Sequence, residues 1–137
     1  MIIDATNLII GRMASEVAKK ALLGEKIDVV NCENAVISGN MAQILAKYRQ
    51  RRERGTPTTG PFFPRAPEML VKRAIRGMLP YKQYKGKTAF KRIRCYSGIP
   101  AELRNDKLNK IENAELKKLP NYNYITVKDV CIFLRGK

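Results

Sequence analysis

The segment that most restricts the fold is residues 2–31, which have the pattern of a strand, a helix and a second strand in direct succession. Residues 2–5 form a short, mostly apolar stretch, and residues 26–31 have an apolar centre. Between them, apolar side chains recur every three or four residues, as on one face of a helix. This face comprises Ile10, Met13, Ala14, Val17, Ala18 and Ala21. Strands joined through a helix are parallel, and parallel sheets are covered on their faces, so the sequence predicts an α/β fold.

Apolar spacing also predicts three later helices. The second helix begins after residue 40, and its apolar stripe continues into a cationic position at Arg52. The stripe itself consists of Met41, Ile44, Leu45 and Tyr48. We therefore expect the helix to extend beyond the domain with its last arginines directed outward; a frayed, exposed helix end is the alternative. The last helix, residues 126–136, begins with Thr126 and Asp129 at the spacing of a capping box.

The third helix is predicted over residues 67–80, with Pro67 at its first position and Pro80 as its stop. Its core side is expected to contain Leu70, Val71, Ala74, Ile75 and Met78. The opposite side carries cations at helical spacing. Residues 81–92 are predicted to form a basic connector, and residues 93–98 alternate as a strand does.

The elements together predict one domain, residues 1–137, in which helices pack on a small parallel sheet. Residues 102–124 are polar and are expected to form a short helix and a loop. A basic excursion at about residues 47–94 is inserted into this domain. It includes the connection between the second and third helices.

Positive charge is concentrated in that excursion. The protein has a formal net charge of +15, and residues 47–94 hold fifteen cations against two acids. Residues 1–46, in contrast, hold four cations and five acids. Solvated protein faces usually mix both signs, so the imbalance predicts a polyanionic partner, and nucleic acid is the usual one.

The loop within the excursion has an unusual composition. The stretch "GTPTTGPFFPRAP", residues 55–67, contains four prolines, two glycines and the adjacent pair Phe62 and Phe63. Proline excludes regular secondary structure, and two phenylalanines do not suit an idle, solvated linker. Arginine makes forked contacts with phosphate, and aromatic rings stack on unpaired bases. We therefore predict that the loop docks on folded RNA; Tyr48 and Phe90 either share this role or lie in the core.

Other residue types exclude most catalytic and metal-binding functions. The chain has no histidine, and Cys32, Cys95 and Cys131 are too far apart to form a zinc or redox motif. We predict no enzyme activity, no cofactor, no metal and no small-molecule substrate. The thiols are expected to be structural, in a reducing compartment. No apolar run approaches the roughly 18 residues of a membrane span, so a soluble intracellular protein without a signal peptide is expected.

Two weaker patterns have an alternative reading each. Gly11 and Gly39 both precede or open a helix, which suits phosphate binding, but neither lies in a nucleotide-binding motif, and tight turns explain them better. Asp4 and Asp28 lie in the two first strands and could form a catalytic pair. Without a metal ligand or a general base nearby, structural roles are favoured.

Several of these segments are long enough to compare with a known family. The chain resembles the L-thirteen family of large-subunit ribosomal proteins in its archaeal and eukaryotic form. The resemblance is carried by "IDAT" followed by "GRMAS", by "VVNCENAVISGN", by "RAIRGMLP", "KGKTAFKR" and "CYSG", and by the loop "GPFFPRAP". These segments cover most of residues 1–100 in the family's order.

The resemblance implies a three-layer α/β/α fold around a sheet of about four parallel strands. It also implies a structural constituent of the large ribosomal subunit that binds large-subunit rRNA early in assembly, beside neighbouring ribosomal proteins in the cytoplasm. The motifs place Arg73, Arg76, Lys85, Lys87, Lys91 and Arg92 in the family's cationic positions, and Arg12 more weakly. From the charge pattern, the loop and the resemblance together, the predicted RNA-binding residues are Arg12, Arg49, Arg51, Arg52, Arg54, Thr58, Thr59, Phe62, Phe63, Arg65, Lys72, Arg73, Arg76, Lys82, Lys85, Lys87, Lys91 and Arg92.

The chain also departs from the family. Bacterial members carry histidines in the loop after the second helix, where this chain has "TPTTGPFF", and after the last strand, where it has "IPAEL". Contacts of the bacterial loop therefore do not transfer to Thr58, Thr59 or Gly60. Two other functions remain open from the residues alone: a DNA-binding or architectural protein, and an α/β enzyme acting on a nucleotide or nucleic acid.

Overall fold

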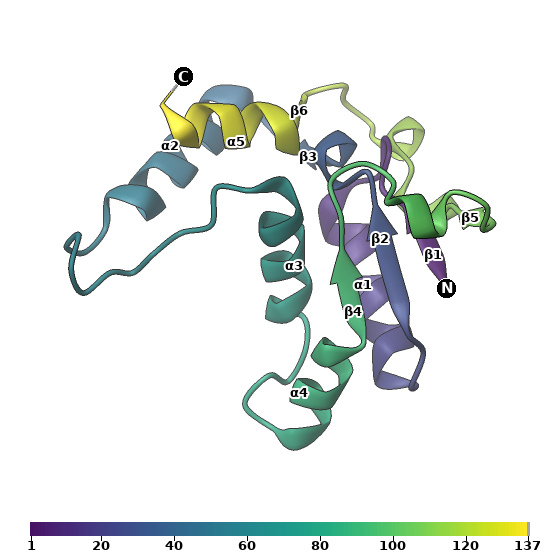
Figure 1. Ribbon diagram of the computed structural model, residues 1–137. Coiled ribbons are helices and arrows are strands. Elements are labelled where there is room, and N and C mark those ends of the chain that lie inside the picture. Colours follow the sequence, from purple (N-terminus) through teal and green to yellow (C-terminus); the bar gives the residue numbers. More distant parts are fainter. Residues whose placement is uncertain (137) are drawn as a thin grey trace.

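The computed structural model describes residues 1–136, and Lys137, the last residue of the predicted domain, lies outside them. A sheet of four parallel strands forms the centre, in the order β4-β2-β1-β5 (Figure 1). The strands are β1 (Ile2–Asp4), β2 (Ile27–Val30), β4 (Ile93–Cys95) and β5 (Leu108–Asn109). Ile3 lies opposite Val29, which lies opposite Cys95. The predicted α/β fold with a small parallel sheet is confirmed.

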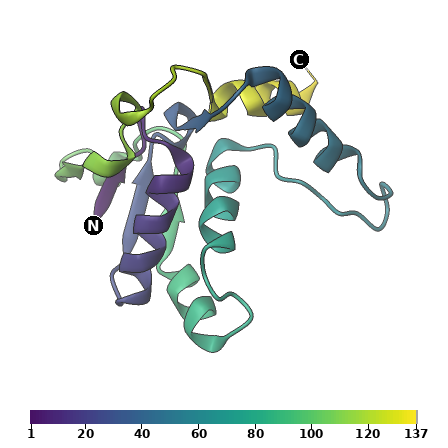
Figure 2. The same cartoon turned by 180° about the vertical axis from the view of Figure 1, so that it is seen from behind.

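Helices α1 (Ile10–Leu22) and α3 (Pro67–Gly77) cover one face of this sheet and contact each other. The view from behind shows them side by side in front of the strands (Figure 2). On the opposite face Asp28 is half-buried and Arg94 is exposed. The connection from β4 to β5 returns across the sheet on that side and contains the short 3₁₀ turn η2 (Ala101–Leu103). The chain moves along the sheet in one direction from β1 through β2 to β4, and in the other direction from β4 to β5. Because connections between parallel strands are right-handed, this reversal places the last connection on the opposite face.

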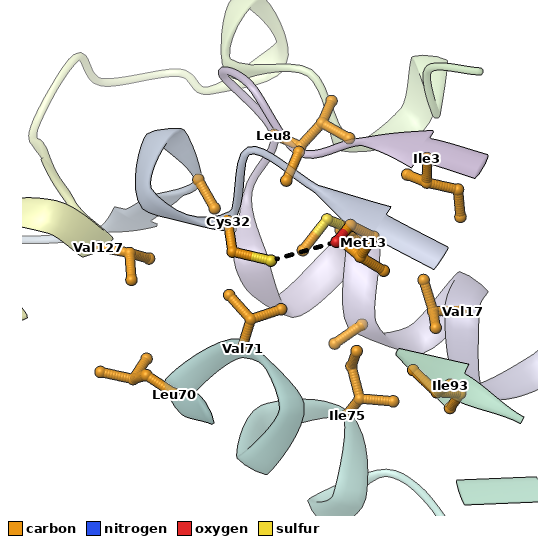
Figure 3. Close-up of a cluster of buried hydrophobic side chains, with 14 of the residues drawn as sticks. Ile3, Leu8, Met13, Val17, Cys32, Leu70, Val71, Ile75, Ile93 and Val127 are labelled. Atoms are coloured by element: carbon orange, nitrogen blue, oxygen red, sulfur yellow. Dashed lines mark hydrogen bonds between the residues drawn. The ribbon is translucent and has the colours of Figure 1, made fainter. Parts of the chain in front are cut away.

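The core lies between the sheet, α1 and α3, and its side chains are close-packed (Figure 3). The apolar face predicted for the first helix is confirmed, since Met13, Val17 and Ala21 are fully buried. Cys32 is also buried, and its thiol donates to the Val29 carbonyl at 3.6 Å. The neighbouring Cys95 thiol and burial raise the pKa of Cys32, so this thiol stays protonated and structural.

The C-terminal elements form a second small sheet beside the first. β3 (Val36–Ser38) pairs antiparallel with β6 (Tyr124–Thr126), and α5 (Val127–Arg135) follows. The Thr126 hydroxyl accepts from the Asp129 amide at 3.2 Å and donates to the Asp129 carboxylate at 2.6 Å. The predicted start of the last helix is confirmed, and burial raises the pKa of Cys131 on its inner face to about 11.

Three predictions about the middle and late segments are wrong. Residues 81–92 contain a helix, α4 (Tyr84–Lys91), instead of only a connector. Its buried residues are the small Gly86 and Ala89, so no stripe of large apolar residues announces it. A Cβ at Gly86 would lie 2.1 Å from the Pro80 carbonyl oxygen, so only glycine permits this close packing.

The other two wrong predictions concern Met78 and residues 102–124. Met78, expected in the core, follows the end of α3 and is 44% exposed, while Leu79 is buried in its place. Residues 102–124 contain β5, which completes the main sheet, together with short 3₁₀ turns. A strand of two residues is too short to show alternation in a sequence.

Candidate nucleic-acid interface

Helix α2 (Met41–Glu53) leads from the small sheet into the basic region. The Asn40 side chain caps it by accepting from the Ala42 amide at 2.9 Å. None of its residues is fully buried, and its C-terminal half lies away from the main sheet, with α5 packed beside it (Figure 1). The helix therefore carries its arginines beyond the core, as the sequence suggested.

The arginines at the end of α2 do not all point into solvent. The Arg52 guanidinium is half-buried and donates to the Leu134 carbonyl at 2.9 Å, so the expectation that it projects outward is wrong. Arg49 lies 5.0 Å from the centre of the Phe133 ring. Both therefore join α2 to α5, since a cation over a ring and a charged hydrogen bond are both attractive. Arg51 and Arg54 are exposed.

The segment from residue 54 to residue 66 connects α2 to α3 without helix or extended strand pairing. Two backbone hydrogen bonds between Thr56 and Gly60, of 2.9 and 3.2 Å, close a tight turn at its start. Thr58 and Thr59 are exposed at that turn, and Arg65 is exposed on the return. A Cβ at Gly55 would lie 1.8 Å from the Gly60 carbonyl oxygen, so the turn requires glycine there.

The outer side of α3 carries three cations, and each lies over an aromatic ring from another element or from the loop. The Arg73 guanidinium is 4.6 Å from the centre of the Phe63 ring. Lys72 lies 5.2 Å from the ring of Phe90. Arg76 lies 5.3 Å from the ring of Tyr81. These contacts hold the charges in place on a surface that combines positive charge with flat apolar rings.

The aromatic residues differ in how far they serve the protein's own packing. Tyr48 and Phe63 meet edge to face with ring centres 5.7 Å apart, and Tyr81 and Phe90 do so at 5.4 Å. Tyr48, Phe63 and Phe90 are half-buried against the core, and burial raises the pKa of Tyr48 despite the nearby Arg51. The core alternative for Tyr48 and Phe90 is therefore correct in part. Phe62, in contrast, is 73% exposed.

Together with α3 and α4, the loop before α3 forms a groove of about 490 Å³, which we call the α3 groove. Its lining residues are Phe62, Phe63, Pro64, Met69, Lys72, Arg73, Arg76 and Phe90. A second groove of about 520 Å³, the loop groove, lies between the end of α2 and the loop and includes Arg52, Arg54 and Arg65. The two grooves share Phe62 and Phe63.

Other predicted residues lie on a separate surface. Lys91 and Arg92, at the end of α4, line a third groove of about 350 Å³ together with Lys26 and Arg94. Arg92 is half-buried and donates to the Ala21 carbonyl at 3.2 Å, so it also fastens the end of α1. Lys26 and Arg94 were not among the predicted RNA-binding residues. The signal was available for Arg94, because it alternates with the inward-facing Ile93 and Cys95 in β4.

The remaining predicted cations are exposed and lie in none of these grooves. Lys82, Lys85 and Lys87 lie on the turn before α4 and on α4 itself, and Arg12 lies on the first turn of α1. The structure thus gathers part of the predicted set on the first two grooves, whereas Arg49, Arg51, Thr58 and Thr59 line neither; the gathered residues are Arg52, Arg54, Phe62, Phe63, Arg65, Lys72, Arg73 and Arg76. It separates Arg12, Lys91 and Arg92 from them.

Asp4, considered above as one of a catalytic pair, has a structural environment. Its Oδ1 atom accepts from the Thr6 amide at 3.1 Å, the Thr6 hydroxyl at 2.7 Å and the Asn31 amide group at 2.9 Å. Burial opposes the charged form, but these hydrogen bonds outweigh it and lower the pKa of Asp4. The carboxylate thus ties the end of β1 to the end of β2.

Two kinds of feature are absent from the described residues 1–136, a metal-binding cluster and a membrane-spanning helix. Within residues 1–136, no three His, Cys, Asp or Glu side chains are grouped as a metal site would need. Across the same part of the chain, no helix combines the length and the apolar character that crossing a membrane requires.

Comparison with known proteins gives consistent similarities. Residues 1–102 match the family model described as ribosomal protein L13. A relative from Methanococcoides burtonii is 46% identical, with 99% of this chain and 98% of the relative covered. One from Methanosarcina barkeri is 47% identical, with coverage of 94% and 93%, and one from Archaeoglobus fulgidus is 42% identical, with coverage of 97% and 86%. All three are named large ribosomal subunit protein uL13, and none is named as an enzyme.

Proposed function

Since the chain belongs to the ribosomal protein L13 family, we propose that it binds and stabilises folded large-subunit rRNA as a structural constituent of the large ribosomal subunit, early in assembly. The protein would then be located in cytoplasmic ribosomes, beside neighbouring ribosomal proteins. No chemical reaction is required of it.

The observation that carries the RNA-binding part is the set of ring-supported cations on α3. Lys72, Arg73 and Arg76 are held over aromatic rings beside an apolar groove. Guanidinium groups contact phosphates in forked geometry, and aromatic surfaces accept unpaired bases. Folded RNA offers both features close together, whereas duplex DNA offers mainly its phosphates.

The mechanism is neutralisation of phosphates combined with insertion of the loop. Binding releases condensed counterions, so the affinity falls as salt is added. The two backbone hydrogen bonds between Thr56 and Gly60 support a loop that has a defined shape before RNA is bound. A shaped loop loses less conformational entropy on binding than a flexible one.

A salt titration tests the proposal. The nuclease-treated protein is bound to a folded large-subunit rRNA domain, to a mixed-sequence DNA duplex and to an unstructured RNA of similar charge. We expect the folded rRNA to stay bound at salt concentrations that release the other two. Parallel loss of all three ligands would reduce the surface to a general polyanion patch, and equal retention of the DNA would favour the DNA-binding alternative.

The residues are tested with the double variant Arg73→Ala and Arg76→Ala. We expect weaker rRNA binding and a salt slope reduced by roughly 0.7–0.9 per lost phosphate contact. Both side chains are exposed, so the melting temperature should stay nearly unchanged. The control is Lys19→Ala with Lys107→Ala, which removes the same charge from exposed positions outside the basic region. An equal effect of both pairs would show that only net charge matters.

A further inference from the structure

The α3 groove has a composition that phosphate binding alone does not explain. Much of its lining is apolar, including Phe62, Pro64 and Met69, and Met69 is 53% exposed although it lies next to buried residues of α3. Exposed apolar surface at a concave site commonly marks a binding site. A surface that served only to neutralise phosphates would have no use for these side chains.

Phe62 is the ring best placed to bind a ligand. It is 73% exposed, whereas its neighbour Phe63 is half-buried and lies under the Arg73 guanidinium. A Cβ at Gly60 would lie 3.2 Å from the Phe62 ring, so the ring rests against the backbone of the turn. This support holds Phe62 in place while leaving the rest of the ring accessible.

The size and charge of the groove restrict what it can hold. Its volume of about 490 Å³ lies within the range of small-molecule sites, which is roughly 300–1,000 Å³, and it suits one nucleotide better than a double helix. Among the described residues, the charged ones that line it are Lys72, Arg73 and Arg76, all of them cations. The site therefore favours an anion that also has a flat apolar part.

We propose that the α3 groove binds a single unpaired nucleotide of the RNA, with its base against Phe62 and its phosphates at Arg73 and Arg76. This inference rests on the proposed function, and it names the part of the RNA that this site takes. An unpaired base exposes its faces for stacking, which a paired base within a helix does not.

The same lining predicts weak base selectivity. Among the described residues, the groove lining includes no Asn, Gln, Asp, Glu, Ser or Thr side chain. The lining side chains that could pair with base edges are therefore Lys72, Arg73 and Arg76, and the proposal places phosphates at two of these three. Stacking tolerates any base because every base has a π face. We therefore expect the site to select for an unpaired nucleotide more than for a particular base.

The test uses two RNA hairpins of equal length, one with a single bulged adenosine and one fully paired. The full chain should bind the bulged hairpin more tightly. The variant Phe62→Ala should lose this preference. Its affinity for the bulged hairpin should fall roughly five- to a hundredfold, as expected for one stacked base. Its salt slope should match that of the wild type, because no charge is removed. Phe62→Trp should restore the preference.

The matched control is Tyr122→Ala, which removes a ring that is 76% exposed and is not among those lining the α3 groove. Equal binding of both hairpins by the wild-type protein would overturn the inference, as would equal losses for the two alanine variants. A competition experiment gives a third outcome. If an acidic, aromatic peptide displaced the bulged hairpin from the wild-type protein but not from Phe62→Ala, the groove would be assigned to a protein neighbour. That result would also overturn the inference. The outcome is separate from the salt titration with folded rRNA, which tests the proposed function.

Discussion

Helices α1 and α2 are both thirteen residues long, yet the fold uses them in opposite ways. Helix α1 has five buried residues and is enclosed by the sheet, α3 and α4, whereas α2 has none. In the apolar stripe of α2, Met41 is exposed and the other three residues are only half-buried, and the stripe ends in arginines. Helix length and propensity are therefore not what separates them. What separates them is how much of each helix another element covers.

The support of α2 comes from far along the chain. Arg52 donates to Leu134, a carbonyl 82 residues away, and Arg49 lies over the Phe133 ring. A helix with few buried contacts opens locally at lower free-energy cost than a core helix. We therefore expect α2 to open locally more readily than α1 and the sheet.

The largest expected effect compares one apolar position in each helix. Met13→Ala in α1 should lower the free energy of unfolding by about 2–5 kcal/mol, because it leaves a cavity in a close-packed core. Ile44→Ala in α2 should cost only about 1 kcal/mol, since Ile44 is half-buried. Urea denaturation measures both. Equal losses would mean that α2 is as firmly held as α1.

The next effect comes from the loop. Phe63→Ser should cost about 2 kcal/mol, because Phe63 packs against Tyr48 of α2 and under Arg73. Phe62→Ser is the control and should leave the melting temperature nearly unchanged, since that ring is 73% exposed. Thermal denaturation followed by circular dichroism distinguishes them. Similar melting temperatures for both variants would show that the loop does not support α2.

A smaller effect tests the link between α2 and α5. Arg52→Ala removes the hydrogen bond to Leu134 and should cost about 1 kcal/mol. Native-state hydrogen exchange should become faster in α2 and stay unchanged in α1. Arg51→Ala serves as the control, because Arg51 is exposed. Its guanidinium lies over the ring of Tyr48, which belongs to the same helix. Faster exchange in α1 as well would show that the two helices open together.

The smallest effect concerns the strand end that precedes α1. The folded-state pKa of Asp4 is lowered, so its charge stabilises the fold above the ordinary pKa of about 3.9 and this contribution is lost as the pH falls through the folded-state value. Asp4→Asn keeps the size and an acceptor oxygen but removes the charge. In urea unfolding the variant should be less stable than the wild type at pH 7, and this difference should shrink as the pH falls below about 3.9. A difference that does not shrink in acid would point to lost geometry instead of lost charge.

The errors in prediction share a physical cause. Helix α4 is packed through the small residues Gly86 and Ala89, and β5 has only two residues, so neither has a periodic apolar pattern. Both are stabilised by neighbours that are distant in sequence, such as β1 beside β5. Met78 shows the same limit, because the end of α3 at Gly77 moves the next buried position to Leu79.

The sequence by itself determined the strand–helix–strand unit at the start, the capped last helix and the position of the positive charge. Each of these depends on residues near one another in the chain, where periodicity and charge are directly legible. Only the tertiary structure decided which rings support which cations. Arg73 meets Phe63 of the loop and Lys72 meets Phe90 of α4 because three segments pack together at one side of the sheet. The same packing decided that Arg52 serves α5 while Phe62 stays exposed beside the α3 groove.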